Sequence, residues 1–308
     1  MSDNPLVSVI MNCHNGEQFL KDAIQSVFNQ SYSNWEIIFW DNASTDESYK
    51  IASSYGQKVK LFKVKKKTSL GKARSEAVKK ANGLWLAFLD VDDIWLPNKL
   101  KSQMAGLVNS DHILSYAGIQ EVDQDLSVIR KLMPRSQSGF QLSSQLIDFD
   151  ITLVTSMINR EKLIELELDF DEQMQASEDY NLFIRLLPHG TVFVCNEILA
   201  LYRIHKESLT YKKIERWSIE RRITLNQLLE KNPSLVDSKA FKIANLQSDY
   251  YSSCYYMSIG NYRKARNYLF QIRNDDRRYY ILWLVSYVPI LWNFIHLRHI
   301  KIKITKFF

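Results

Sequence analysis

The sequence predicts an α/β protein with a mostly parallel central sheet flanked by helices, followed by a helical C-terminal extension. Short apolar runs alternate with helix-periodic segments through the first part of the chain, which is typical of a parallel sheet. From about residue 212 the pattern is helical only. At 308 residues, with 46% hydrophobic and 24% charged residues, the chain is long enough for one large domain with a helical appendage and is not disordered.

Four apolar runs in the first part are predicted as buried strands, over 6–11, 35–40, 59–64 and 84–89. The helix after the first strand is predicted from apolar residues at helical spacing, namely Phe19, Leu20, Ala23, Ile24, Val27 and Phe28. The acidic, hydroxyl-rich turn at 41–48 predicts a second helix capped by Ser44 or Thr45. A third helix over 71–83 is predicted to close at Gly83.

The pattern is less regular after residue 110. Strands are predicted over 112–119, 151–159, 191–196 and 200–205. The segment 177–187 predicts a helix whose apolar face is Leu182, Phe183 and Leu186, with Ser177 as its cap. We expect the first domain to span 1–210 and the helical extension to span 211–308.

The last fifty residues have a different character. Residues 279–297 contain no Asp, Glu, Lys or Arg, and nearly reach the ~20 apolar residues that cross a bilayer. Because Pro289 interrupts this run, we expect an interfacial helix or a re-entrant pair; a true span and helices packed on the domain are the alternatives. A basic end follows and favours an anionic membrane surface over nucleic acid; it comprises Arg298, Lys301, Lys303 and Lys306.

The cysteine usage and the N-terminus indicate a reducing compartment. Cys13, Cys195 and Cys254 are far apart and odd in number, which favours neither a metal cluster nor a disulfide framework. The first residues lack the positively charged and long apolar stretches of a secretory signal. We therefore expect a cytoplasmic protein.

Three polar turns follow the predicted strands, at 12–16, 41–46 and 90–93. Because ligands of parallel sheets bind beyond the carboxyl ends of the strands, these turns are expected to converge on one crevice. The last turn holds Asp90, Asp92 and Asp93, and such a group is costly to bury without a positive partner. Its oxygen ligands suit Mg²⁺ or Mn²⁺. The alternative is a solvated acidic turn that caps the following helix.

Phosphatases of the haloacid dehalogenase type place a similar pair of aspartates after an apolar strand, and "FLDVDDIW" partly matches that pattern. Those motifs normally open their domain, whereas two strand–helix units precede this one. Ile94 also stands where Thr or Val is expected. The phosphatase is therefore the weaker interpretation.

Four segments in order resemble the family 2 glycosyltransferases, which have an A-type nucleotide-sugar fold. They are the opening through "WDNASTDES", the stretch "GKARSEAVKKANGLWLAFLDVDDIWLPNKL", the helix "SEDYNLFIRLL" and the closing "LALYRIHKESLT". The resemblance covers about residues 5 to 210 and is typical of enzymes that build bacterial cell-surface polysaccharides.

The resemblance implies a role for each matching position. The nucleotide-binding residues would be Asn12, His14, Asp41, Asn42, Arg74 and Asp90. Asp92 and His205 would bind Mn²⁺ or Mg²⁺, and Arg203 would lie near the diphosphate. Asp179 would be the general base, with Glu178 beside it. For Arg74 the alternative is an ordinary surface arginine, and for His205 an ordinary edge-strand histidine. Asn42 stands where the family often has Asp, so uridine and thymidine diphosphate sugars both stay open.

The implied activity is a metal-assisted, inverting transfer of a sugar from a nucleotide diphosphate sugar to a hydroxyl. The acceptor is expected to be a lipid-linked or lipopolysaccharide-type glycan. With the basic C-terminal end, this places the protein on the inner face of a bacterial plasma membrane, in peripheral contact with anionic lipid and without a nucleic-acid partner. A non-catalytic membrane scaffold on a decayed transferase fold is a further alternative. The dinucleotide-binding glycine fingerprint is absent from the first turn, which argues against an oxidoreductase.

Overall fold

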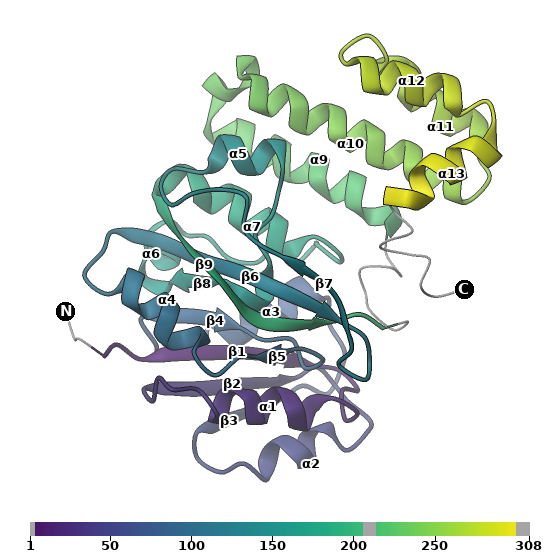
Figure 1. Ribbon diagram of the computed structural model, residues 1–308. Helices are drawn as coiled ribbons and strands as arrows, with labels where there is room; N and C mark the ends of the chain where they lie inside the picture. The colour runs from purple at the N-terminus through teal and green to yellow at the C-terminus, as the bar shows by residue number, and fades with distance from the viewer. Residues whose placement is uncertain (1–3, 206–213, 300–308) are drawn as a thin grey trace. The chain divides into compact units, whose positions relative to one another are not determined.

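The computed structural model describes residues 4–205 and 214–299. The chain divides into two compact units, Met1–His205 and Lys206–Phe308, and each is described by itself. Figure 1 shows that all the strands belong to the first unit, and that the described part of the second unit is helical.

One sheet runs through the first unit, in the order β3-β2-β1-β4-β8-β6-β9-β5, with β7 paired to β6. Its first four neighbours are parallel: β3 (Val59–Lys63), β2 (Trp35–Asp41), β1 (Val7–Cys13) and β4 (Trp85–Phe88). These are the four strands predicted in the first part of the chain. The α/β class with a central sheet and flanking helices is confirmed.

The remaining strands make the second half of the sheet mixed. Strands β6 (His112–Val122) and β9 (Thr191–Arg203) pair in parallel, whereas β8 (Met157–Asn159), β7 (Val128–Leu132) and β5 (Ile94–Trp95) pair antiparallel to their neighbours. Two predictions are wrong here. The strand expected over 151–159 begins only at Met157, after the 3-10 turn Leu153–Thr155. The strands expected over 191–196 and 200–205 are one continuous strand, β9.

Seven α-helices of the first unit connect these strands: α1 (Leu20–Phe28), α2 (Ser48–Ser53), α3 (Leu70–Val78), α4 (Lys99–Leu107), α5 (Leu142–Ile147), α6 (Arg160–Glu165) and α7 (Glu178–Leu186). The 3-10 turn Leu187–His189 leads from α7 into β9.

Two predicted helix ends differ from the structure, and a third agrees with it. Helix α2 starts later than Ser44 or Thr45, because the Asp41 side chain binds the backbone of Ser44 and holds it in a turn. Helix α3 ends at Val78, and Gly83 instead packs against the backbone of Ser8, where a Cβ would come within 2.5 Å of the Ser8 nitrogen. Ser177 does occupy the N-cap position of α7, although its side chain makes no capping bond.

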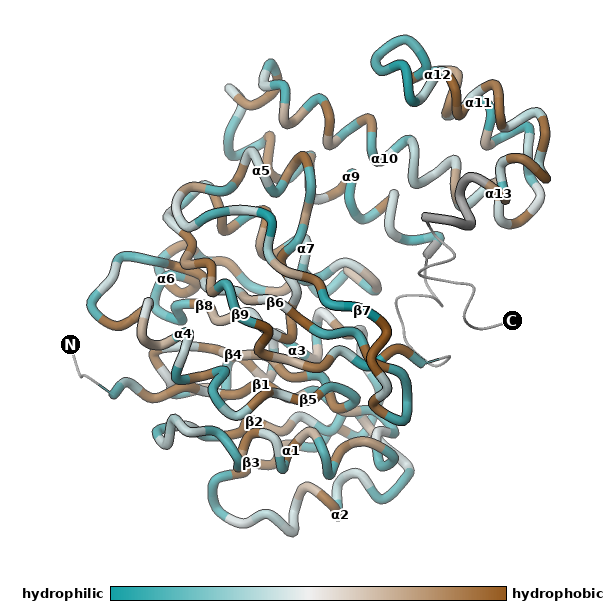
Figure 2. Tube along the Cα trace, viewed as in Figure 1, coloured by the Kyte–Doolittle hydropathy of each residue, from teal (hydrophilic) through white to brown (hydrophobic). Residues whose placement is uncertain are grey.

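One hydrophobic cluster of the first unit lies between the sheet and helices α1 and α4. Alternate residues of β1 and β2, such as Val9, Met11 and Phe39, are buried there against Leu20, Ile24 and Leu100. Helix α3 contacts β1 and β2 without joining this cluster, and so covers the opposite face of the sheet. Figure 2 shows the strands of this unit as largely hydrophobic and the connecting turns as polar.

The second unit consists of α9 (Ile214–Lys231), the 3-10 turn Pro233–Asp237, α10 (Lys239–Ser258), α11 (Tyr262–Ile272), α12 (Arg277–Val285) and α13 (Pro289–His299). Its core contains Cys254, Met257, Leu269, Ile272 and Trp292. The apolar run at 279–297 forms α12 and α13 rather than one helix. Within the described ranges, no helix has both the length and the apolar character required to cross a bilayer. Lys301, Lys303, Lys306 and the side chain of Arg298 lie outside the described residues.

Candidate active site

The first two polar turns meet because β1 and β2 are parallel and end in register, with Cys13 opposite Asp41. The His14 ring donates from Nδ1 to the carbonyl oxygen of Asn42, 3.0 Å away. Two further bonds join these turns, from the backbone nitrogens of Asn15 and Gly16 to the hydroxyls of Ser44 and Ser48. The predicted convergence is therefore present for these turns.

The polar side chains of these turns are largely engaged. Asp41 is fully buried, where Oδ1 accepts from the Ser44 nitrogen at 2.8 Å and Oδ2 lies 3.3 Å from Lys63 Nζ. Asn42 Oδ1 accepts two bonds from Thr68 and Asn42 Nδ2 donates to the Thr68 carbonyl, which leaves one amide hydrogen for a ligand. Asn12 Nδ2 is buried and has no hydrogen-bond partner within the described residues.

The acidic turn lies next to the first turn. A Cβ on Gly16 would come within 2.7 Å of the Val91 side chain, so the chains approach closely there. Asp93 is buried and anchors the turn, because its Oδ1 accepts from the backbone nitrogen of Arg203 at 2.8 Å. Burial and the neighbouring Asp92 and Asp90 carboxylates raise the pKa of Asp93 well above its usual range.

Asp92 and His205, both predicted as metal ligands, are in contact. His205 Nε2 lies 2.8 Å from Asp92 Oδ2. Arg203 binds the same turn, since its Nε donates to the Asp92 carbonyl at 2.9 Å and its other nitrogens reach Gln124 O and Asp22 Oδ2. A diphosphate contact by Arg203 would have to use the two N–H groups that these bonds leave.

Arg74 links the acidic turn to the Glu-Asp pair. Its NH2 donates to Asp90 Oδ1 at 2.7 Å, and its NH1 pairs with Glu178 Oε1. Arg74 is almost fully buried, so the alternative of a surface arginine is wrong. The two acidic groups, 88 residues apart in the chain at Asp90 and Glu178, therefore lie on either side of one guanidinium.

This arrangement follows from how α3 is held. A Cβ on Gly71 would lie 2.2 Å from the carbonyl oxygen of Asp171, so α3 packs directly on the segment that leads into α7. Ser69 Oγ donates to the Glu172 carbonyl at 2.7 Å, and Lys72 Nζ lies 3.1 Å from the Glu172 carboxylate. These contacts place Arg74 against the first residue of α7.

Three carboxylates surround the single positive charge of Arg74. Burial raises the pKa of Glu178 to about 7; Arg74 opposes this shift, while Asp179 and Asp90 add to it. Burial also raises the pKa of Asp179. Because the cluster holds more negative than positive charge, it retains a proton at a higher pH than isolated carboxylates would. A carboxylate with such a pKa is suited to accept a proton near neutral pH.

Sequence reasoning missed two residues near this site. The Phe19 ring lies 5.4 Å from the His205 ring and 4.3 Å from the Arg203 guanidinium, although its spacing predicts an ordinary core residue of α1. Lys63, the ion-pair partner of Asp41, ends a predicted strand in a lysine-rich stretch. Neither residue carries a local signal, because both roles depend on contacts far along the chain.

The donor set fits a hard divalent cation. Adjacent ligands of an octahedral ion, with bonds of ~2.1 Å, lie about 3 Å apart, and the 2.8 Å between Asp92 Oδ2 and His205 Nε2 is close to that spacing. In the part of the chain that the structure describes, no group of three or more acidic, His or Cys side chains is arranged to hold a metal ion. A cation held by Asp92 and His205 alone would keep coordination positions for phosphate and water ligands, as Mg²⁺ and Mn²⁺ sites often do.

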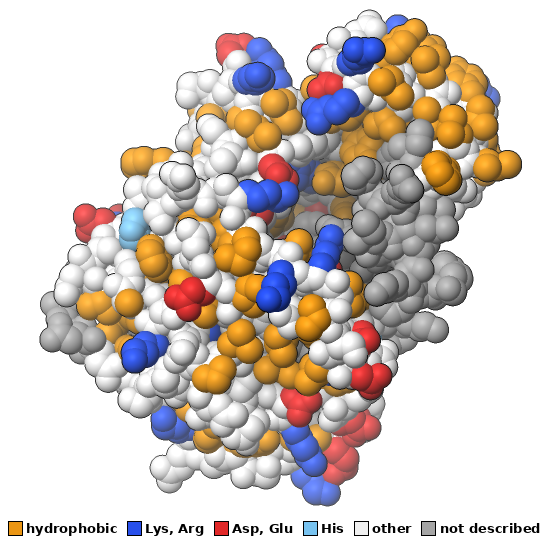
Figure 3. Space-filling model, in the orientation of Figure 1, with side chains coloured by type: hydrophobic (Ala, Val, Ile, Leu, Met, Phe, Trp, Pro, Cys, Tyr) orange, Lys and Arg blue, Asp and Glu red, His pale blue; other side chains and the backbone are white. Residues whose placement is uncertain are grey.

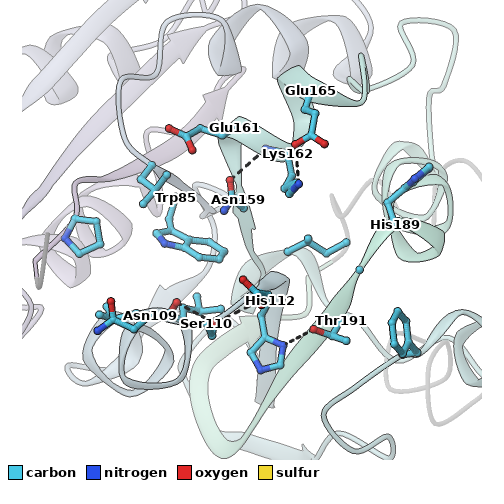
Figure 4. A pocket seen from close by; sticks show the side chains of 18 residues that line it. Trp85, Asn109, Ser110, His112, Asn159, Glu161, Lys162, Glu165, His189 and Thr191 are labelled. Atoms are coloured by element: carbon cyan, nitrogen blue, oxygen red, sulfur yellow. Dashed lines mark hydrogen bonds and ion pairs between the residues drawn. The ribbon is translucent and has the colours of Figure 1, made fainter. Parts of the chain in front are cut away.

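A cavity of about 500 Å³ opens elsewhere in the first unit. Figure 4 shows its lining side chains, among them Trp85, His112 and Thr191, which begin β4, β6 and β9. His112 Nδ1 lies 2.8 Å from Thr191 Oγ1. The cavity is thus at the amino ends of the strands, opposite the edge where the predicted site residues gather.

The comparisons with known proteins agree with the resemblance. The family model described as glycosyl transferase family 2 matches residues 8–166. The chain belongs to this family. It is 30% identical over 230 residues to an uncharacterised glycosyltransferase of Methanocaldococcus jannaschii, which covers 72% of this chain and 79% of that protein. It is 29% identical over 224 residues to the Escherichia coli UDP-Glc:alpha-D-GlcNAc-diphosphoundecaprenol beta-1,3-glucosyltransferase WfgD, covering 70% and 86%.

Solved structures show the same fold. TarS of S. aureus, crystallised with UDP-GlcNAc, superposes on this family 2 chain with a TM-score of 0.65 at 16% identity, covering 96% of this chain and 91% of that one. The mannosyltransferase PcManGT of Pyrobaculum calidifontis, in complex with GDP-Man and Mn²⁺, gives a TM-score of 0.61 at 13% identity, covering 96% and 87%. The protein is a family 2 glycosyltransferase. The phosphatase and the non-catalytic scaffold find no support.

Proposed function

We propose that this glycosyltransferase moves a sugar from a UDP- or dTDP-sugar to a hydroxyl of a lipid-linked glycan, with inversion of configuration. The observation that carries the proposal is the buried cluster in which Arg74 contacts both Asp90 and Glu178. It brings the turn suited to a cation and a diphosphate next to Asp179, a candidate base.

The donor is proposed to bind along the carboxyl edge of β1, β2 and β4. Asn12 has a buried amide nitrogen without a hydrogen-bond partner, and Asn42 has one amide hydrogen left. Both are suited to contact the nucleotide base. Asp41 and His14 hold the two turns in place. Asp90 is proposed to contact the ribose or a water bound to the cation. The UDP-GlcNAc complex of TarS supports a uridine diphosphate donor.

In the proposed reaction Asp179 takes the proton of the acceptor hydroxyl. The acceptor oxygen then attacks the anomeric carbon from the face opposite the nucleotide. The bond from that carbon to the diphosphate oxygen breaks, and its electron pair leaves with the nucleoside diphosphate. Because there is one displacement, the configuration inverts. Glu178 keeps Arg74 in place, and burial together with the Asp179 and Asp90 carboxylates raises the pKa of Glu178 itself.

Asp92 and His205 are the residues proposed to hold Mn²⁺ or Mg²⁺, with Arg203 bracing the backbone of the same turn. A bound cation supplies positive charge for the diphosphate as it leaves. The Mn²⁺ in the PcManGT complex supports a divalent cation in this fold. An imidazole ligand favours Mn²⁺ over Mg²⁺, which prefers oxygen ligands alone.

The acceptor and the location are the remaining parts of the proposal. The name of WfgD, which acts on a diphosphoundecaprenol-linked sugar, supports a lipid-linked acceptor. An enzyme with such an acceptor works at the cytoplasmic surface of the plasma membrane, in peripheral contact with lipid. The domain division at about residue 210 separates the catalytic part from the helical extension.

Two substitutions test the proposal together. Asp179→Asn should keep Mn²⁺-dependent binding of UDP but release UDP from the donor at least ~100-fold more slowly when bacterial membranes supply the acceptor, because the base is lost. Asp92→Ala should lose the stabilisation that UDP with Mn²⁺ gives to the folded protein. Thermal shift measures binding, and UDP release from a panel of UDP- and dTDP-sugars measures turnover.

Glu161→Gln is the control, since this carboxylate borders the cavity at the other edge of the sheet. It should leave both measurements unchanged. Normal turnover in Asp179→Asn would remove this residue from the role of base. The cation site would be refuted if the wild type binds UDP equally well with Mn²⁺ and with EDTA, and if Asp92→Ala binds it equally well too.

A further inference from the structure

Exposed apolar side chains are concentrated in the last helices of the second unit. On α12 they are Tyr280, Ile281 and Leu284, in the turn Tyr287 and Val288, and on α13 Ile290, Leu291 and Phe294. Phe270 of α11 is a further member. Figure 3 shows hydrophobic side chains gathered over these helices. Monomeric soluble proteins rarely expose a continuous apolar surface of this kind without a binding role.

The exposed residues form one side of a helix pair, and the other side is packed. Leu282, Trp283, Val285 and Trp292 belong to the core cluster of the unit, with Leu269 and Ile272. The pair is therefore an ordered part of the fold, and its exposed residues are not core residues left uncovered by poor packing. We call the eight exposed residues of α12, the turn and α13 the apolar face.

Aromatic rings and arginines surround the apolar face. The Trp283 ring lies 5.9 Å from Tyr280 and 5.7 Å from Tyr287. The Arg273 guanidinium lies 3.4 Å from the Phe270 ring centroid, and Arg266 lies 4.9 Å from that of Tyr287. Tyr, Trp and Arg at the border of an apolar surface are typical of the membrane–water interface.

The charge of this region is strongly positive. Residues 261–308 contain ten Lys and Arg but only two acidic residues, a net charge of +8, whereas the first 260 residues carry −2. The two acids, Asp275 and Asp276, adjoin Arg277 and Arg278, and Asp276 is paired with Arg278. Basic residues before and after an apolar face in the sequence complement an anionic lipid surface.

We propose that the apolar face of α12 and α13 binds the surface of an anionic lipid bilayer, with both helices lying in the plane of the interface. At 9 and 11 residues, each helix is too short to cross a bilayer, which takes ~20 residues. The face inserts among the lipid head groups, while Arg266, Arg273 and Arg277 remain at head-group level.

Lipid fits this surface better than a second copy of the chain. A symmetric dimer through the apolar face would bring two strongly basic regions together, which is unfavourable, whereas anionic lipid neutralises them. The inference deepens the proposed function, because it names the part of the chain that brings the enzyme to a lipid-linked acceptor. It does not depend on the catalytic assignments.

Vesicle flotation of the full-length protein tests the proposal. The wild type should bind vesicles of phosphatidylcholine with 30% phosphatidylglycerol and bind pure phosphatidylcholine at least ~10-fold more weakly. The double variant Ile281→Asp/Ile290→Asp places one charge on each helix of the apolar face, and should weaken binding to the mixed vesicles ~10-fold or more. Raising the salt to 1 M should weaken wild-type binding by less than the double variant does. Salt screens the charges but not the apolar contribution to binding.

A matched control is available on the first unit. Ile147 and Ile164, at the end of α5 and on α6, are 40% and 62% exposed, against 46% and 83% for Ile281 and Ile290. The variant Ile147→Asp/Ile164→Asp should bind vesicles like the wild type. Circular dichroism and the thermal shift produced by UDP with Mn²⁺ verify that each variant is folded and that the nucleotide site is intact.

Vesicle binding that survives Ile281→Asp/Ile290→Asp, or that is lost equally in the control, overturns the proposal. So does a wild type that ignores vesicles but dissociates from dimer to monomer on this substitution in sedimentation velocity, since the occupant would then be a second copy. Loss of vesicle binding with unchanged UDP binding supports the lipid surface. Failure of UDP to bind the wild type would count against the proposed function and leave the lipid result intact.

Discussion

At the scale of single residues, Arg74 decides how the site is charged. It is buried between Asp90 and Glu178, with Asp179 next in the chain, so one guanidinium faces three carboxylates. Its own pKa is raised by these acids against the effect of burial. The carboxylates therefore compete for one positive charge. The pH at which the cluster releases its proton depends on all of them together.

This cluster predicts the pH dependence of the reaction. A base must be ionised, so activity is lost as pH falls through the pKa of the base. Burial raises the pKa of Asp179, so that loss should come at a higher pH than for an exposed carboxylate. Glu178→Gln removes one of the carboxylates. It should move the acidic limb of the kcat/KM profile by roughly 1 pH unit to lower pH. The measurement is a pH–rate profile from pH 4 to 9.

Glu76→Gln is the control for this prediction, because Glu76 lies on α3 like Arg74 but pairs with Lys79 at the surface. Its profile should match that of the wild type. An acidic limb near pH 4 in the wild type, or one that Glu178→Gln does not move, contradicts the charge assignment.

The sequence predicted which residue types would gather at the site, but not how they are bonded. Asp90, Asp92 and Glu178 could be found because acids that follow an apolar strand or begin a helix stand out in the sequence. The bonds of Asn42 to Thr68, and of Arg203 to the backbone of Asp92, could not be found, because they depend on the path of turns between elements. These contacts hold Asn42 and Arg203 in the surrounding turns and leave each of them part of its hydrogen-bonding capacity for a ligand.

At the scale of elements, helix α3 connects the acidic turn at 90–93 to the Glu178–Asp179 pair. Its Gly71 lies against the carbonyl of Asp171, in the segment before α7, and Arg74 follows one turn later. Helix α7 then leads through a 3-10 turn into β9, which ends at Arg203. The positions of Arg74 and of the Glu178–Asp179 pair thus depend on the contact between α3 and residues 169–174.

Gly71→Ala tests that contact. The added methyl group meets backbone rather than a movable side chain, so α3 must shift, at a cost of about 1–3 kcal/mol of unfolding free energy. Because Arg74 moves with the helix, turnover should fall by more than the loss of folded protein explains. Denaturant unfolding and UDP release measured on the same samples separate these effects.

Gly106→Ala is a matched control on α4, where a Cβ would come within 2.3 Å of the Phe193 ring. It should destabilise the fold without changing the turnover of the folded protein. Equal turnover in the two variants would mean that α3 does not position the site.

Element prediction failed where local sequence and tertiary pairing disagree. The polar residues Asn196 and Glu197 interrupt the apolar pattern of 191–205. The register with β6 shifts at these two residues, yet pairing on either side of them keeps the strand continuous. Only three residues of the apolar run 151–159 find strand partners, between β4 and β6. The residues of a segment predicted that a strand exists there, but the length of the strand was set by the neighbouring strands with which it can pair.

At the scale of the whole molecule, two of the hydrophobic clusters among the described residues have no residue in common. One lies within Met1–His205 and the other within Lys206–Phe308. The sequence indicated this division through the change from alternating to helical pattern near residue 210. All the predicted site residues belong to the first unit, and the apolar face belongs to the second.

Separate cores predict two unfolding transitions in calorimetry. UDP with Mn²⁺ at about 100 times its Kd should stabilise only the transition of the first unit, by about 2.7 kcal/mol. Leu269→Ala should lower only the other transition, by about 2–5 kcal/mol, because Leu269 is fully buried in the second core. A single transition that both changes shift together would show that the two units unfold as one.

The excess of acidic groups around Arg74 also bears on the order of substrate addition. A free nucleoside diphosphate is an anion and meets repulsion at such a crevice, whereas its chelate with a divalent cation is nearly neutral. The crevice thereby discriminates between two forms of the same molecule in solution. The initial rate should depend on the concentration of the chelate between the cation and the nucleotide. An excess of nucleotide without bound cation should inhibit the reaction only weakly.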